Sequence, residues 1–169
     1  RIHSLIDRDN LSKEWQIHEL AKVMLKDGRT RAKFTDFMIV WLDMKNKELP
    51  TISRKQYPDF NSALALDLRR SLLSWIEKSI WEETISWKEF IQMDKVQINE
   101  RIAKFYDIAF PEDGNVTGFW ETNASVLDRT GLFTHPYILA SHSYAEESSP
   151  IHRGVFTARK ILGRSLRPP

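Results

Sequence analysis

The stretch NSALALDLRRSLLSWIEKSI, residues 61–80, carries a clear helical pattern. Its apolar residues recur every three or four positions, which places them on one face of a helix. The residues that we expect to face inward are Leu64, Leu68, Leu72, Trp75, Ile76 and Ile80. Asn61 precedes them and is a residue type that favours the N-cap position. The spacing therefore predicts a long helix that begins after Asn61.

Two further helices are predicted upstream of this stretch. Ser12 is a candidate N-cap, and the apolar residues at helical spacing that follow it are Ile17, Leu20, Ala21 and Met24. A second run repeats the spacing with Phe34, Phe37, Met38 and Trp41, and its wide apolar surface indicates a nearly enclosed helix. The short break at Asp27 and Gly28 predicts that the two helices form a hairpin.

Local signals downstream mark shorter helices. Residues 86–89, Ser-Trp-Lys-Glu, match a capping box, and residues 98–106 form another short helical segment. Residues 111–115 have turn chemistry. Pro136 is expected near a helix start. Ser149 as N-cap with Pro150 at the first helical position predicts the start of the last helix.

The last helix is expected to end at Gly163 as its C-cap. Its expected inward stripe is Ile151, Val155, Ala158 and Leu162. Because no segment shows sustained alternation of apolar and polar residues, the sequence predicts an all-α fold: a single compact domain of roughly six or seven helices over residues 1–167. Residues 168–169 would begin a proline-rich linker. The chain begins at Arg1 and ends in two prolines, so we expect a fragment of a longer polypeptide.

Composition and charge narrow the classes of function. The chain has 169 residues, with 25 Lys and Arg against 23 Asp and Glu, and its 41% hydrophobic content is ordinary for a folded domain. No acidic residue follows Glu147, whereas five basic residues do: Arg153, Arg159, Lys160, Arg164 and Arg167. A basic helix can meet nucleic acid, an anionic membrane or an acidic partner. These charges are not contiguous, so a solvated face is the favoured interpretation and no nucleic-acid partner is predicted.

The chain has no cysteine, which excludes disulfides, thiolate metal sites and covalent haem attachment within these residues. No run approaches the roughly 18 to 20 apolar residues of a membrane-spanning helix, so no span is predicted in this segment. The residues also contain no recognisable signal peptide.

Candidate chemistry is sparse. None of the five histidines forms a short ligand motif, and no metal site or catalytic residue is predicted. His135, His142 and His152 have two interpretations: axial ligands to a haem or metal, or ordinary hydrogen-bonded imidazoles, which are favoured. The paired glutamates at 82–83 and 146–147 point in different directions on a helix, so surface charge explains them better than acid–base catalysis.

Two polar motifs raise structural questions. A glycine inside a helix costs about 1 kcal/mol relative to alanine, so Gly154 predicts the close approach of another backbone, or else of a ligand. Arg153 beside it could then bind a carboxylate or a propionate-type anion. The Asn99, Glu100 and Arg101 group is interpreted as a structural polar network rather than a catalytic one.

Several segments together resemble one family. Residues 99–106, NERIAKFY, resemble the "NERLAxxYG" signature of a domain of unknown function in planctomycete-type cytochrome c proteins. Residues 129–134 are similar to its "RxGLLT", and residues 148–154, which include Ser149, Pro150 and Gly154, to its "TSPVxRG". Further matches in order are residues 37–42 to "FxxQWL", 57–60 to "FPDFD" and 162–169 to "LLGxPPPPPP". The motif residues taken as structural are Asn99, Glu100, Arg101, Gly131, Ser149, Pro150, Arg153 and Gly154.

The resemblance implies a location and a context. Members of this family are large exported bacterial proteins that carry a c-type haem motif elsewhere in the chain. We therefore expect an exported protein of the periplasm or cell envelope, no cofactor within this segment, and haem c in neighbouring regions of the parent chain. The family pattern places an acidic residue where this chain has Trp75, and the proline tract here is only Pro168 and Pro169. The resemblance supplies no catalytic residue.

Two main functional hypotheses follow, and nucleic-acid binding through the basic last helix is a third and weaker one. The first is a non-catalytic helical scaffold or interaction module whose partners are other domains or subunits of a haem-bearing envelope complex. The second is an oxidoreductase or electron-transfer segment in which a histidine ligates haem or metal carried by the parent protein. The cofactor-binding candidates for the second are His135, His142, His152 and Arg153.

Overall fold

The structure is a computed structural model that describes residues 13–45, 48–81, 85–109 and 118–166. The chain divides into two compact units, Arg1–Val40 and Trp41–Pro169, and each is described by itself. The expected Ser12 cap, the turn at 111–115 and the linker at 168–169 lie outside the described residues. No helix within the described ranges is both long enough and apolar enough to cross a membrane.

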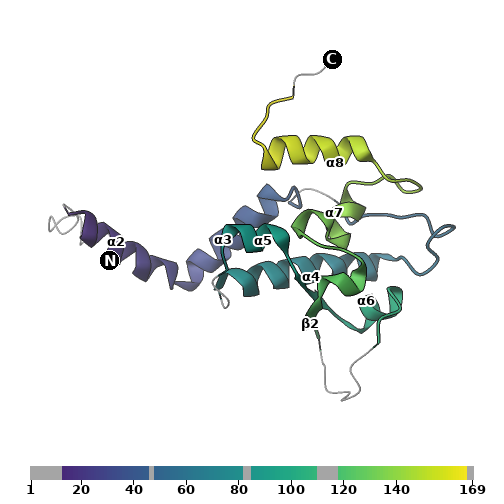
Figure 1. Cartoon of the computed structure of the whole chain (residues 1–169), viewed down its shortest axis with the longest axis horizontal. Coiled ribbons are helices and arrows are strands. Elements are labelled where there is room, and N and C mark those ends of the chain that lie inside the picture. The colour runs from purple at the N-terminus through teal and green to yellow at the C-terminus, as the bar shows by residue number, and fades with distance from the viewer. Residues whose placement is uncertain (1–12, 46–47, 82–84, 110–117, 167–169) are drawn as a thin grey trace. The chain divides into compact units, whose positions relative to one another are not determined.

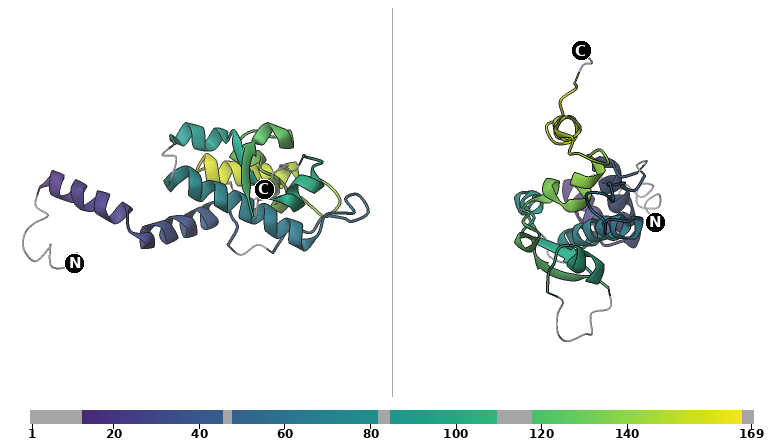
Figure 2. Two further views of the ribbon diagram at one scale, coloured as in Figure 1. Left: turned by 90° about the horizontal axis from the view of Figure 1, so that it is seen from below. Right: turned by 90° about the vertical axis from the view of Figure 1, so that its right-hand side faces the viewer.

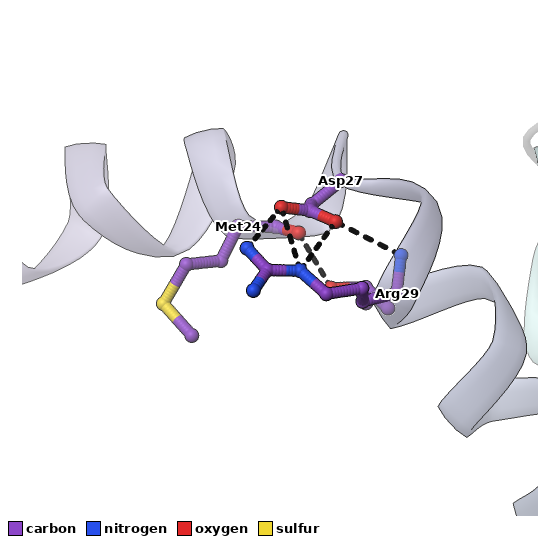
Figure 3. A network of polar contacts seen from close by, with 4 residues as sticks. Met24, Asp27 and Arg29 are labelled. Atoms are coloured by element: carbon purple, nitrogen blue, oxygen red, sulfur yellow. Dashed lines mark hydrogen bonds and ion pairs between the residues drawn. The ribbon is translucent and has the colours of Figure 1, made fainter. Parts of the chain in front are cut away.

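The first unit contains α2 (Glu14–Leu25) and most of α3 (Gly28–Trp41). Polar contacts fix the joint between them (Figure 3). The Asp27 carboxylate accepts a hydrogen bond from the backbone N–H of Arg29 at 2.9 Å and pairs with the Arg29 guanidinium at 2.7 Å. The Thr30 hydroxyl donates to the carbonyl of Met24 at 2.6 Å. The Arg29 contacts lower the pKa of Asp27 to about 2, so the joint keeps its charge pair at neutral pH.

Both helices of the first unit expose apolar side chains. No residue of α2 is buried, and Ile17 is 54% exposed, so the predicted hairpin, which would bury one face of α2 against α3, is wrong. Phe37 and Val40 are 56% and 47% exposed, so α3 is not nearly enclosed as predicted. Helical spacing identifies an apolar face, but it does not identify what covers that face.

The second unit is organised around α4 (Ser62–Trp81), as the opening stretch predicts. The Asn61 side chain accepts from the backbone N–H of Leu64 at 2.9 Å and caps the helix. Five of the six predicted inward residues are buried: Leu64, Leu68, Leu72, Trp75 and Ile76. In Figures 1 and 2, α4 runs through the unit, with α6 (Glu100–Phe105) and α7 (Pro136–Ser141) against it.

A two-stranded antiparallel sheet packs against α4, so the predicted all-α class is wrong and the fold is mixed but dominated by helices. Strand β1 (Lys95–Ile98) pairs with β2 (Trp120–Asn123), with Val96 opposite Thr122 and Ile98 opposite Trp120. The last three residues of β1 are all buried, so the strand shows no polar–apolar alternation. Four residues are also too few to reveal a period of two.

Glu121 ties this sheet to α4. Its carboxylate pairs with Lys78 of α4 at 2.7 Å and with Lys95 of β1 at 3.2 Å, and it accepts from the Gln97 amide at 3.0 Å. Burial alone would raise the pKa of Glu121, but the hydrogen bonds from the two lysines outweigh it and the pKa is lowered. The carboxylate therefore stays ionised and fixes the sheet on the helix.

The capping signals located the shorter helices correctly. Ser86 and Glu89 form the predicted capping box of α5 (Trp87–Gln92), and Asn99 caps α6. Helix α7 begins at Pro136, and α8 (Pro150–Phe156) begins after Ser149. Two 3₁₀-helical turns, η1 (Ala124–Leu127) and η2 (Leu132–Thr134), and a π-helical extension of α8, η3 (Thr157–Ile161), complete the order of elements.

The end of the last helix is as predicted, but its inward face is not. Gly163 takes a left-handed conformation with φ of 60°, and the N–H of Arg164 donates to the carbonyl of Ala158 at 2.9 Å. However, Ile151 and Leu162 are 75% and 61% exposed. Phe156 is the buried residue of this helix. Val155 and Ala158 are half-buried, so the predicted inward stripe is wrong at its two ends.

Candidate functional site

His135 links three elements of the second unit. The backbone N–H of Tyr137 donates to its Nδ1 at 3.2 Å, so the proton lies on Nε2. Nε2 is 3.3 Å from the hydroxyl of Ser71, which in turn donates to the carbonyl of Gln97. The imidazole is fully buried, and burial lowers its pKa to about 3. His135 is thus a neutral imidazole with both nitrogens engaged between α7, α4 and β1.

His142 lies at the opposite end of α7. Its Nδ1 is 2.9 Å from the carbonyl of Ile138, which makes Nδ1 the protonated nitrogen that donates to it. The ring packs on Phe156 with centroids 4.4 Å apart, and the side chain is 3% exposed. His142 therefore anchors α8 on the end of α7.

His152 and Arg153 lie on α8. His152 is exposed and packs on Tyr144 with ring centroids 5.0 Å apart, and Arg153 is half-buried. No cavity described below contains any of the three histidines or Arg153, so the structure does not gather the four cofactor-binding candidates into one pocket.

His135 does not fit haem or metal ligation in this arrangement. An axial ligand needs an unprotonated ring nitrogen with a free lone pair. In His135 the unprotonated Nδ1 already accepts from Tyr137, and the buried ring faces protein on all sides. Within the described ranges no three His, Asp or Glu side chains cluster closely enough to hold a metal.

The residues Asn99, Glu100 and Arg101 stabilise the start of α6 and its contact with α4. The Asn99 side chain accepts from the N–H of Ile102 at 3.0 Å and starts α6. The Arg101 guanidinium pairs with Asp67, a buried carboxylate on α4. Glu100 is exposed in the first turn of α6, where the helix dipole favours a negative charge. The group therefore joins α6 to α4.

The glycine that another backbone approaches is Gly131, not Gly154. Gly131 has φ of 85°, and a Cβ built on it would lie 3.3 Å from the carbonyl oxygen of Ile91. A Cβ on Gly154 would have no atom within 4 Å, so the predicted close approach at that position is wrong within this chain. Ser149 and Pro150 start α8, with the Ser149 hydroxyl accepting from the N–H of His152 at 3.3 Å.

A cavity of about 310 Å³ lies in the second unit and is termed the aromatic pocket. Its apolar wall consists of Phe60, Leu68, Phe105, Pro136, Leu139 and Ala140. Its polar and charged lining comprises Tyr57, Tyr106, Tyr144, Arg129, Glu146 and Glu147. The volume is at the lower end of the range of small-molecule sites, which are typically about 300–1,000 Å³.

Segments that are distant in the sequence build this pocket. Residues 52–60 precede α4, and the N–H of Ser53 donates to the carbonyl of Ala145 at 2.7 Å. Ala145 belongs to a tight turn closed by the bridge between Ser143 and Ser148. Four of the motif segments quoted above therefore meet here, through Tyr57, Tyr106, Arg129 and Ser148.

The charges around the pocket are not paired with each other. Arg129 donates to the carbonyl of Asp128 at 3.0 Å and forms no ion pair with a described residue. Burial raises the pKa of Tyr106, and the charge of Arg129 partly opposes that shift. Both side chains line the same pocket, so its lining includes a neutral phenol and a cation.

Sequence reasoning did not select Tyr57, Tyr106 and Arg129 as site residues. They stood in the quoted segments, but no short motif connected them, because the three positions converge only in the fold. The available signal was the clustering of tyrosine and arginine at the ends of those segments.

Comparison with known proteins identifies the domain class. Residues 1–108 match the family model PSD4, described as a protein of unknown function (DUF1592), and residues 129–169 match PSCyt3, described as a protein of unknown function (DUF1588). The first match covers more than half of the chain, so the chain belongs to the PSD4 family. Both are domains of planctomycete-type cytochrome c proteins, which confirms the family resemblance. Searches of curated proteins and of solved structures found no match.

The two family matches meet at the aromatic pocket. Tyr57, Phe60 and Phe105 come from the PSD4 match, whereas Arg129, Leu139 and Ser148 come from the PSCyt3 match. Binding sites are common where two structural modules adjoin, so this pocket is the candidate functional site of the chain.

Proposed function

We propose that this chain is a non-catalytic helical scaffold and interaction module of an exported, haem-associated bacterial multidomain protein. Family membership supports the haem-associated context. The structural use of the motif residues supports a scaffold, because Asn99, Arg101 and Gly131 join elements of the fold. The partners proposed are other domains or subunits of a haem-bearing complex in the cell envelope.

The observation that carries the proposal is the outward face of α8 and η3. Ile151 and Leu162 are largely exposed, and Gly154 between them has open space where a side chain would stand. In Figure 1, no other described helix or strand of the second unit is drawn above α8. A helix-interior glycine costs about 1 kcal/mol, and the cost is explained if a partner backbone occupies that space.

The charge of α8, η3 and the residues after them indicates the chemistry of the partner. Arg159 and Arg164 are exposed and Arg153 is half-buried, none of them forms an ion pair with a described residue, and no acidic residue follows Glu147. Apolar side chains beside free cations complement a segment with apolar and acidic residues. We therefore assign the face to an acidic amphipathic segment of a neighbouring haem-bearing domain or subunit.

Thiol labelling tests this assignment in the intact native protein. Because the chain has no cysteine, Gly154→Cys introduces a single reporter into it. Ser125→Cys, at an exposed position of η1, is the matched control. The proposal expects labelling at 154 to be at least about tenfold slower than at 125, and to accelerate at high salt as the charges are screened.

Equal labelling rates at the two positions would contradict the docking face. Protection of position 154 only after addition of anionic vesicles, or only after addition of DNA, would replace the protein partner with a membrane or a nucleic acid. Both alternatives follow from the same basic charge, but neither explains the open backbone at Gly154.

Absorbance spectroscopy distinguishes the scaffold proposal from the alternative of an oxidoreductase segment. If the chain is a scaffold, His142→Gln and His152→Gln leave the Soret absorbance of the intact native protein unchanged. A shifted Soret band in either variant would support an oxidoreductase segment in which that histidine ligates haem. A native protein with no Soret band and no covalent haem mass would remove the haem-associated context altogether.

A further inference from the structure

We propose that the aromatic pocket binds a small aromatic monocarboxylate, with the ring against the apolar wall and the carboxylate at Arg129 and Tyr106. The inference goes beyond the docking face on α8, because it concerns a different surface and a different class of ligand.

The wall of the pocket fits an aromatic ring. Phe60 and Phe105 meet edge to face with centroids 6.0 Å apart, and Phe105 meets Tyr106 in the same way at 5.2 Å. Aromatic rings of this kind favour offset or edge contacts with a further ring. A cavity of about 310 Å³ suits a single-ring compound rather than a macrocycle.

Donors in the lining of the pocket can bind an anion. The Arg129 guanidinium has one hydrogen bond, to the carbonyl of Asp128, and so retains donors for a carboxylate. The Tyr57 and Tyr106 side chains line the pocket, and their hydroxyls form no hydrogen bond with a described residue. Guanidinium binds carboxylate in a planar, two-point geometry, and a phenol can donate a third hydrogen bond.

The acidic side of the pocket limits the charge of the ligand. Glu146 and Glu147 lie on the turn that closes the pocket, and neither forms an ion pair with a described residue. Two carboxylates near one guanidinium repel a dianion such as a phosphate ester more strongly than a monoanion. Among anions, a ligand with a single negative charge is therefore favoured.

Calorimetric titration of the intact protein with 3-phenylpropanoate tests the proposal. The uncharged 3-phenylpropanamide and ring-free propanoate are the matched probes. Arg129→Gln should weaken binding of the carboxylate by at least about tenfold, because it removes a charged hydrogen-bond donor. Arg164→Gln, an exposed arginine outside the pocket, should leave the affinity unchanged.

A second variant examines the wall independently of the charge. Ala140→Phe places a ring into the cavity and should abolish binding, whereas Ser125→Ala should not. Absence of binding at millimolar 3-phenylpropanoate would overturn the proposal. Equal binding of the amide, or an Arg129→Gln affinity equal to that of the unmodified protein, would also overturn it. None of these outcomes bears on thiol labelling at position 154.

Discussion

The Nε2–H of His135 donates to the hydroxyl of Ser71, 64 residues earlier in the chain, at 3.3 Å. Because the Ser71 hydroxyl donates its own hydrogen bond to the carbonyl of Gln97, these hydrogen bonds join α7, α4 and β1 inside the second unit. The imidazole must stay neutral for the arrangement to persist, since a second ring proton would oppose the N–H of Tyr137 at Nδ1.

The neutral His135 predicts that stability falls with acidity. The folded pKa is about 3 and the ordinary value is 6.5, so below pH 6.5 the unfolded chain binds a proton that the folded chain does not. Stability is therefore fully present above pH 6.5 and declines as the pH falls toward the folded pKa. The free energy of unfolding should drop by up to about 1.4 kcal/mol per pH unit. Urea denaturation at pH 7, 6 and 5 measures this slope.

Two variants test whether the buried ring of His135 causes the pH dependence of the free energy of unfolding. His135→Gln should remove the pH dependence, at some cost in stability, whereas His152→Gln, at an exposed histidine, should retain it. A slope that persists in His135→Gln would show that another group titrates in this range.

The histidines illustrate how far the sequence could lead. His135 and His142 were candidates on residue type alone, and the residues that engage them, Ser71 and Ile138, are not marked by any motif. The aromatic pocket escaped prediction for the same reason. Tyr57 and Arg129 become neighbours of one cavity through the packing of α4, α6 and α7, which no local pattern encodes.

The two informative glycines make a matched pair for a stability test. Gly131→Ala forces a side chain into positive φ and against the Ile91 carbonyl, so it should lower the free energy of unfolding by about 1–3 kcal/mol. Gly154→Ala adds a methyl group in open space within a helix and should raise it by about 0.5–1 kcal/mol. Thermal or urea unfolding of both variants measures these changes. Equal effects at the two sites would contradict the assigned roles.

Local signals predicted helix starts well and missed long-range pairing. Asn61, Ser86, Asn99 and Ser149 act within three residues of themselves, so their roles can be read from the sequence. The pairing of Ile98 with Trp120 joins residues 22 positions apart, beyond the reach of a local pattern, and so the sheet was not foreseen. The exposed Ile151 and Leu162 show the same limit, because apolar spacing does not distinguish a core from an exposed face.

The lowered pKa of Glu121 predicts a second loss of folding stability in acid, at a lower pH than that of His135. Its pKa is lowered from 4.5 in the folded chain, so its contribution is present above pH 4.5 and is lost as the pH falls below that value. Glu121→Gln should reduce stability by about 1–2 kcal/mol at pH 7, because Lys78 and Lys95 lose a shared partner. The difference between the two proteins should shrink below pH 4.5. A difference that is constant from pH 7 to pH 3 would argue against an ionised Glu121.

Ser71 has a buried hydroxyl that forms hydrogen bonds, whereas the buried hydroxyl of Tyr137 has none with a described residue. Ser71→Ala leaves the Nε2–H of His135 and the Gln97 carbonyl without their partner in a buried site, so unfolding should become easier by about 1–3 kcal/mol. The Tyr137 hydroxyl is buried with no hydrogen-bond partner among the described residues, so Tyr137→Phe removes a polar group that burial penalises. Its free energy of unfolding should stay the same or rise by up to about 1 kcal/mol. Urea unfolding at pH 7 distinguishes the two variants. A loss in Tyr137→Phe as large as that in Ser71→Ala would mean that the phenol has a partner in solution, most simply an ordered water.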